Sequence, residues 1–142
     1  MRIRDYREED YPEIEELWKL TGIFTFERGD GASRIESCNR AGGKFLVMQE
    51  ASHGKIIGTS WLSWDGRRIY LHHFAIHPGY QSRGLGRTLA LASIEFARTM
   101  DCPVKLEVHR DNIKAVNLYK SLGFESFEGY EVQMLRNPEI QR

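Results

Sequence analysis

The sequence predicts a mixed α/β domain, in which helices pack on a central sheet with both antiparallel and parallel strands. The chain has 142 residues, the size of one domain with its own core, so residues 1–142 are expected to form a single domain. Segments in the first half alternate apolar and polar side chains between turn signals, which is typical of antiparallel strands. A helical pattern and then a β-rich segment follow, and a strand reached through a helix is a parallel neighbour.

The first half is predicted to contain most of the antiparallel sheet and two helices. Pro12 is tolerated in a first helical turn, and Gly22 can end that helix. Turn signals at 52–54 and 65–66 separate the alternating segments, as in a meander of hairpins. The expected elements are strands at 2–6, 44–50, 56–64 and 68–76 and helices at 9–20 and 33–41.

The second half is predicted to add two helices and the parallel strand. One helix begins after Gly84, a strand follows at 103–109, and Asn112 and Gly123 can cap and end a second helix. A closing hairpin is expected across Gly129. Its strands would span 124–128 and 131–135, which makes the element order β-α-α-β-β-β-α-β-α-β-β, with six or seven strands and about four helices.

The stretch from His72 to Leu91 carries the strongest functional signal, because its pattern predicts a strand, a glycine-containing turn and a helix. The first turn of a helix directs N–H groups and the positive end of its dipole toward one point, which favours a phosphate. Gly84 and Gly86 lack a Cβ and allow close approach, while Arg83 and Arg87 add positive charge.

Two common phosphate-binding motifs fit this turn poorly. A dinucleotide fingerprint needs glycine or alanine where Leu89 stands, and a Walker loop needs lysine where Leu85 stands. A tight βα turn with arginines for solubility is the simpler alternative for a lone G-x-G.

A resemblance to a known family favours the functional interpretation. Residues 81–86 (QSRGLG) resemble the Q/R-x-x-G-x-G/A signature of the GCN5-related N-acetyltransferases, the GNAT family. Residues 112–124 (NIKAVNLYKSLGF) resemble the same family's second landmark, N-x-x-A-x-x-L-Y-x-x-x-G-F. The resemblance is closest over 74–124, and it implies the GNAT fold and transfer of acetyl from acetyl-CoA to an amine.

The resemblance also implies where acetyl-CoA binds. The pyrophosphate would lie at the turn and the pantetheine along the preceding strand, where a main-chain N–H would stabilise the oxyanion of the attacked thioester. Asn112 would bond the pantetheine or only cap its helix. The implied acetyl-CoA-binding residues are Phe74, Ala75, Ile76, Gln81, Ser82, Arg83, Gly84, Leu85, Gly86, Arg87, Asn112 and Tyr119.

Two residues are candidates for acid–base catalysis. Tyr119 matches the family's usual acid, although a core aromatic would look the same. Glu107 matches the catalytic glutamate of the ribosomal-protein N-acetyltransferases, and an acid between apolar neighbours in a central strand is expected to face a cleft that raises its pKa. A surface carboxylate is the alternative. His72, His73 or a water relay could replace Glu107 as the base.

The predicted function is direct acetyl transfer to a primary amine of a small molecule or peptide. The acceptor would enter near residues 24–30, Trp61, Trp64 and Tyr130, and Glu27 and Asp30 there suggest a cationic acceptor. A protein N-terminal acetyltransferase is the alternative among enzymes. A non-catalytic acyl-CoA sensor and a nucleotide-binding domain are alternatives of other classes.

Composition excludes several partners and cofactors. Twenty basic and twenty acidic residues cancel, so nucleic acid and membrane surfaces are not expected partners. No signal peptide is apparent, and a cytoplasmic monomer or homodimer is expected. Cys38 and Cys102 lack metal-ligand spacing, and His73 and His77 are too far apart along one strand for a shared ion, so no metal is expected.

Overall fold

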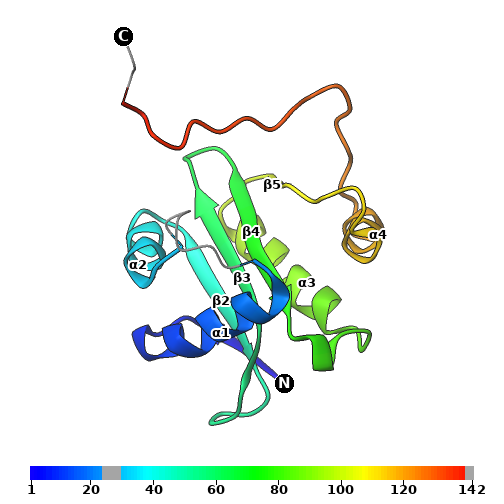
Figure 1. Ribbon diagram of the computed structural model, residues 1–142. Coiled ribbons are helices and arrows are strands. Elements are labelled where there is room, and N and C mark those ends of the chain that lie inside the picture. The colour runs from blue at the N-terminus through cyan, green and yellow to red at the C-terminus, as the bar shows by residue number, and fades with distance from the viewer. Residues whose placement is uncertain (24–29, 140–142) are drawn as a thin grey trace. The chain divides into compact units, whose positions relative to one another are not determined.

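Figure 1 shows the computed structural model, which describes residues 1–23 and 30–139. The chain divides into two compact units, Met1–Glu107 and Val108–Arg142. Within the described residues, the first unit holds a five-stranded mixed sheet with α1, α2 and α3, and the second holds α4. The predicted mixed α/β class is confirmed.

The sheet changes from antiparallel to parallel at its last pair of strands. Its strands are β1 (Arg2–Asp5), β2 (Lys44–Gln49), β3 (Ile56–Trp64), β4 (Ile69–Ile76) and β5 (Val104–Leu106). They lie in this order across the sheet, and only β4 and β5 are parallel. The reason is α3 (Leu85–Thr99), which carries the chain back before β5 begins, so that β5 runs in the direction of β4.

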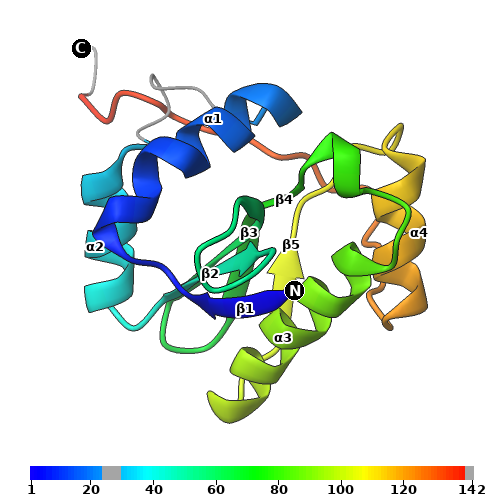
Figure 2. The ribbon, with the colours of Figure 1, turned by 90° about the horizontal axis from the view of Figure 1, so that it is seen from below.

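Helices cover both faces of this sheet (Figure 2). On one face lie α1 (Tyr11–Thr21) and α2 (Ala32–Arg40), and α3 lies on the other. Successive residues of β3 show the alternation: Trp61 stacks on Trp18 of α1, whereas the Ser60 hydroxyl lies 2.7 Å from that of Ser93 in α3.

A cluster of buried apolar side chains lies between the sheet and the first two helices. Its buried members are Ile14, Leu17, Trp18, Ile35, Phe45, Val47, Ile56, Trp61 and Ala75. Trp18 is fully buried, and its ring centroid lies 5.9 Å from that of Phe45 and 6.0 Å from that of Trp61. This face therefore carries much of the packing that holds β3 and β4 in place.

A bulge interrupts β4 in the middle of the sheet. Two of its residues, His73 and Phe74, lie opposite the single residue Ser60 of β3. His73 has φ 48°, in the left-handed region that side chains disfavour. Thr59 Oγ1 donates to the His73 carbonyl at 2.9 Å, and Trp18 Nε1 donates to that hydroxyl at 2.9 Å. The bulge is thus anchored to β3 and α1.

The second unit contains α4 (Ile113–Ser121). The Asn112 side chain accepts a hydrogen bond from the Ala115 N–H at 3.3 Å, as expected of an N-cap. Gly123, with φ 98°, follows the last turn and ends the helix. Both predicted boundaries are confirmed. None of the described helices is long and apolar enough to span a membrane.

The predictions for the C-terminal strands are wrong. The strand expected at 103–109 covers only Val104–Leu106, and no strand forms in the described part of the hairpin expected at 124–135, although Gly129 turns with φ 85°. Apolar alternation produces a strand only where a neighbouring edge accepts its hydrogen bonds and one face is buried. After the half-buried Phe124, the large apolar side chains of this segment are at least 70% exposed: Phe127, Tyr130, Val132, Met134 and Leu135.

Candidate functional site

A turn joins β4 to α3, as the glycine-containing motif predicts. It includes a 3₁₀ helix, Pro78–Tyr80, which His77 caps by accepting the Gly79 N–H on Nδ1 at 3.0 Å. Gln81 Nε2 donates to the Ile76 carbonyl at 2.9 Å. Both hydrogen bonds join residues that are close in the sequence, so the turn and the end of β4 are held together by local contacts.

The first turn of α3 presents backbone donors. Gly84 precedes the helix with φ 79°, and the first helical bond runs from the Thr88 N–H to the Gly84 carbonyl. The N–H groups of Leu85 and Gly86 therefore have no acceptor within the helix. A Cβ on Gly84 would meet nothing within 4 Å, so the backbone there is approachable. Open N–H donors at a helix N-terminus fit a phosphate group.

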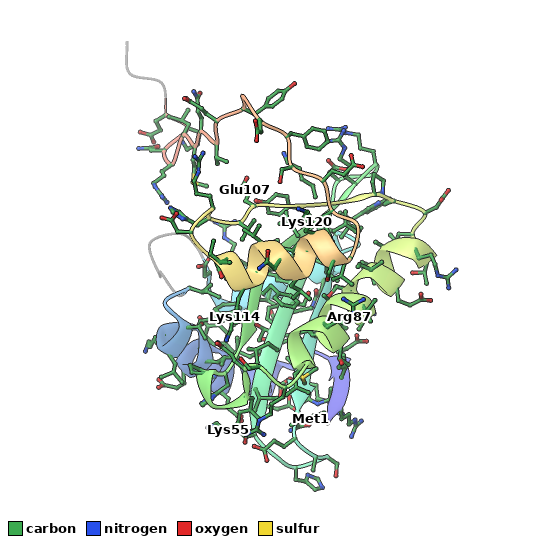
Figure 3. The ribbon with its side chains drawn as sticks, turned by 90° about the vertical axis from the view of Figure 1, so that its right-hand side faces the viewer. Met1, Lys55, Arg87, Glu107, Lys114 and Lys120 are labelled. Atoms are coloured by element: carbon green, nitrogen blue, oxygen red, sulfur yellow. The ribbon has the colours of Figure 1, made fainter. Side chains whose placement is uncertain are left out.

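The predicted arginines lie in the same region. The Arg83 guanidinium donates to the Gly79 carbonyl at 3.2 Å and lies 5.1 Å from the centroid of the Tyr80 ring. Arg87 is exposed on the first turn of α3, where Figure 3 labels it. Ser82 is exposed in the turn with φ 64°. Donors and positive charge together match the chemistry of a pyrophosphate.

The carboxyl-terminal end of β4 lies where the sheet stops pairing with β5. Ala75 and Ile76 are buried and Phe74 is half-buried. Pairing between β4 and β5 covers only Ile69–Leu71 on β4, so the two strands part before residues 74–76. This separation agrees with the resemblance, which places the pantetheine arm along the same residues.

Three polar side chains form a chain beside the bulge. His72 Nδ1 lies 3.0 Å from His73 Nδ1, and His73 Nε2 lies 2.9 Å from Asp30 Oδ2. The Asp30 carboxylate is 7% exposed and the His73 ring 16%. Trp61 packs against both imidazoles, with ring centroids 4.7 Å from His72 and 4.9 Å from His73. Burial, and then the neighbouring His73, lowers the pKa of His72 to about 4.

Glu107 lies next to this group of three side chains along the sheet. It directly follows β5 and is exposed, so the expectation that it would be enclosed within a central strand is wrong (Figure 3). Burial, and then a hydrogen bond to Glu107, raises the pKa of Tyr70. The Tyr70 ring also lies 5.4 Å from that of His72. Sequence reasoning missed Tyr70. Its place two residues before His72, on the same strand face, could have indicated it.

The two remaining predicted residues belong to the second unit. Asn112 caps α4 through its side chain, and Tyr119 lies seven residues later on the same helix. Tyr119 is 8% exposed, and its ring lies 5.5 Å from that of Phe124. Burial raises the pKa of the Tyr119 hydroxyl to about 12, so it is protonated at neutral pH.

The residues predicted at the acceptor side lie in different environments. Residues 24–29, with Phe24, Phe26 and Glu27, lie outside the described residues. Trp61 is 5% exposed and belongs to the core cluster, whereas Trp64 is 38% exposed.

Across 1–23 and 30–139, no three His, Cys, Asp or Glu side chains are grouped to hold a metal ion.

The half-buried His72 predicts a pH-dependent stability. Its folded pKa of about 4 lies below the ordinary value of 6.5, so the unfolded chain binds more protons between these values. Its stabilising effect is complete above pH 6.5 and lost as pH falls toward 4, by about 3 kcal/mol in the free energy of unfolding. Urea unfolding at pH 7 and pH 4.5 should show this fall, and His72→Gln should reduce it. An equal fall in both proteins would contradict the prediction.

Comparisons with known proteins agree with this fold. The sequence model of the family described as "Acetyltransferase (GNAT) family" matches residues 3–124. A solved acetyltransferase of Trypanosoma brucei is 25% identical, with 94% of this chain and 99% of that chain covered and a TM-score of 0.75. An acetyltransferase of Streptococcus agalactiae is 19% identical, with 94% and 90% covered and a TM-score of 0.77. A GNAT-family acetyltransferase of Staphylococcus aureus is 20% identical, with 87% and 82% covered and a TM-score of 0.77. The last two likenesses show the fold alone.

Proposed function

The chain belongs to the acetyltransferase (GNAT) family and is therefore an acyltransferase, and we propose that it transfers acetyl from acetyl-CoA directly to a primary amine of a small molecule or peptide. One observation carries the proposal: the turn after β4 brings the donors of Leu85 and Gly86 and the charge of Arg83 to the N-terminus of α3. Phosphates bind such a terminus through backbone donors and the helix dipole. The pyrophosphate of acetyl-CoA would bind there, with Gln81, Ser82 and Arg87 beside it.

The rest of the coenzyme would follow β4. Its pantetheine would lie along Phe74, Ala75 and Ile76, where β4 no longer pairs with β5, and Asn112 would add a hydrogen bond in addition to capping α4. A main-chain N–H near the bulge would stabilise the charge that develops on the thioester carbonyl oxygen. Thioester and amine held in one place react faster than in solution because their orientation is already set.

Glu107 and Tyr119 are the proposed base and acid. The Glu107 carboxylate is exposed and oriented by Tyr70, so it can receive a cationic amine and take its proton. The buried Tyr119 hydroxyl stays protonated and can give a proton to the departing thiolate. A proton donor or acceptor of this kind contributes about 10²- to 10⁴-fold to a rate.

An acceptor screen tests the function. Thiol release from acetyl-CoA is measured with a polyamine, an amino sugar, free lysine and a peptide with an unblocked N-terminus, and each N-acetylated counterpart is the control. Transfer to at least one free amine and to no blocked one is expected. Transfer to the peptide N-terminus alone would favour the N-terminal acetyltransferase. Binding of acetyl-CoA without any transfer would favour the sensor instead.

Replacement of Tyr119 by Phe is expected to lower kcat by about 10²-fold with little change in acetyl-CoA affinity. The ring keeps its packing against Phe124 while the donated proton is lost. Steady-state rates and calorimetric titration separate the two effects, and Tyr6→Phe, whose ring packs against Phe45 outside the proposed site, is the matched control. A wild-type kcat in Tyr119→Phe would show that another group protonates the thiolate.

A further inference from the structure

The connection between β2 and β3 contacts the turn between β4 and α3 at two points. The Tyr80 hydroxyl donates to the carboxylate of Glu50, the residue directly after β2. Lys55, labelled in Figure 3, places its Nζ 3.2 Å from His77 Nε2. The two contacts join residues that are 30 and 22 positions apart in the sequence. The proposed function gives neither contact a role, although both support the turn that would bind the pyrophosphate.

Tyr80 is held by contacts at its hydroxyl and at its ring. The hydroxyl bonds Glu50, and the ring meets the His77 ring edge to face, with centroids 5.5 Å apart and planes 86° apart. The Tyr80 side chain is half-buried, whereas the preceding Pro78 and Gly79 are exposed. An aromatic ring that is packed on one side and bonded at its polar end has a defined orientation.

The Arg83 guanidinium packs on the Tyr80 ring. Its Cζ lies 5.1 Å from the ring centroid, and its Nη2 donates to the Gly79 carbonyl at 3.2 Å. The face of an aromatic ring attracts a cation, and a hydroxyl that donates to a carboxylate makes the ring more electron-rich. The two contacts hold the long Arg83 side chain over the turn, directly before Gly84 and the N-terminus of α3.

These contacts leave most donors of Arg83 available. The bond to Gly79 uses one of the five guanidinium N–H groups, and stacking on a ring uses the face of the group rather than its N–H edge. The side chain is exposed, and no carboxylate within residues 1–23 and 30–139 forms an ion pair with it. An arginine loses rotamer freedom when it binds an anion, so a side chain that is ordered beforehand binds more tightly.

We propose that Tyr80 and Glu50 are positioning residues for the coenzyme: Glu50 orients the Tyr80 ring, and the ring holds the Arg83 guanidinium where it meets the pyrophosphate of acetyl-CoA. This inference rests on the proposed function, because it takes the pyrophosphate to bind at the N-terminus of α3. It extends the binding site to the end of β2, a segment outside the motif at 81–86. Neither residue contacts the reacting atoms, so the effect of replacing them falls on affinity and on KM rather than on kcat.

A double-mutant cycle on the full chain tests the proposal by calorimetric titration of acetyl-CoA. Arg83→Gln is expected to weaken binding by about 10-fold, because a charged donor is lost. Tyr80→Leu is expected to weaken it by about 2- to 5-fold. In the Arg83→Gln background, Tyr80→Leu should cause no further loss, because no cation remains for the ring to hold. Equal losses in both backgrounds would show that Tyr80 only supports the turn, and would overturn the proposal.

Further variants separate the ring, the hydroxyl and the carboxylate. Tyr80→Phe keeps the ring and should lose less affinity than Tyr80→Leu. Glu50→Gln and Glu50→Ala both remove the negative charge, but only Gln keeps an acceptor for the hydroxyl, so the Ala variant should bind acetyl-CoA more weakly than the Gln variant. Equal affinities of these two would overturn the role of Glu50. Phe127→Leu removes an 80% exposed ring in the second unit and should bind like the wild type.

Arginine side-chain spectra of the ¹⁵N-labelled full chain test the contact without coenzyme. The Nε–H signal of Arg83, assigned through Arg83→Gln, should show a more ordered group than that of Arg110, which is exposed in the second unit. Heteronuclear NOE values should show this order in the wild type and in Tyr80→Phe, and its loss in Tyr80→Leu. An Arg83 group as mobile as Arg110 in the wild type would overturn the proposal.

The titrations also distinguish this proposal from the proposed function. If the wild type binds acetyl-CoA and the losses in Tyr80→Leu and Arg83→Gln are additive, the positioning role fails alone. If the wild type does not bind acetyl-CoA, the proposed function fails, and the positioning role fails with it.

Discussion

Replacement of Gly86 by Glu is expected to abolish acetyl-CoA binding, with a loss in affinity of at least about 100-fold. Gly86 is the second residue of α3, beside the N–H groups proposed to bind the pyrophosphate. A carboxylate there would occupy the anion site and repel the phosphates, in addition to removing close backbone approach. Calorimetric titration of acetyl-CoA into the wild type and the variant measures the change directly.

The matched control is Leu91→Glu. Leu91 lies on α3 with a 48% exposed side chain, so the same charge is added to the same helix beyond its first turn. It should bind acetyl-CoA like the wild type. Equal affinities in wild type and Gly86→Glu would place the pyrophosphate elsewhere. Failure of the wild type itself to bind acetyl-CoA would leave the family fold without the activity proposed for it.

Replacement of Trp18 by Ala is expected to lower the free energy of unfolding by about 3–5 kcal/mol. Trp18 is fully buried against Phe45 and Trp61, and its Nε1 donates to Thr59. The substitution leaves a cavity and also removes the donor to the hydroxyl that bonds the bulge carbonyl at His73. Urea denaturation at pH 7 would measure the loss.

Two variants show which part of Trp18 matters. Trp18→Phe keeps an aromatic ring without the N–H donor and should cost less than Trp18→Ala. Leu20→Ala, on the same helix with a 57% exposed side chain, should stay within about 0.5 kcal/mol of the wild type. If Trp18→Ala were no less stable than Leu20→Ala, burial of Trp18 in this cluster would not stabilise the protein.

Local signals predicted the helix boundaries correctly. Gly22 and Gly123 end α1 and α4 with φ values of 76° and 98°, and Asn112 caps α4 with its side chain. Gly84 adopts φ 79° directly before α3. Each of these depends on a backbone conformation or hydrogen bond within a few residues of the position concerned. Such rules act on neighbours along the chain, so the printed sequence contains the information they need.

The bulge and the histidine chain could not be predicted in the same way. Asp30 directly precedes the N-cap of α2 and meets His73 of β4 only when distant segments pack together. His73 lies at the bulge because the register of β3 and β4 leaves one residue extra. The alternation of apolar and polar residues at 131–135 is also a local signal, yet these residues form no strand in the described part of the protein. A strand depends on an edge and a buried face that other parts of the chain must supply.

The sequence by itself determined the turn between β4 and α3, the capped helices and the family of this protein, because glycine conformations, caps and short motifs act between near neighbours. Only the tertiary structure decided which side chains stand beside the end of β4. Asp30 lies 2.9 Å from His73, although it comes from a distant segment, and contacts between distant segments arise only when the sheet and helices pack.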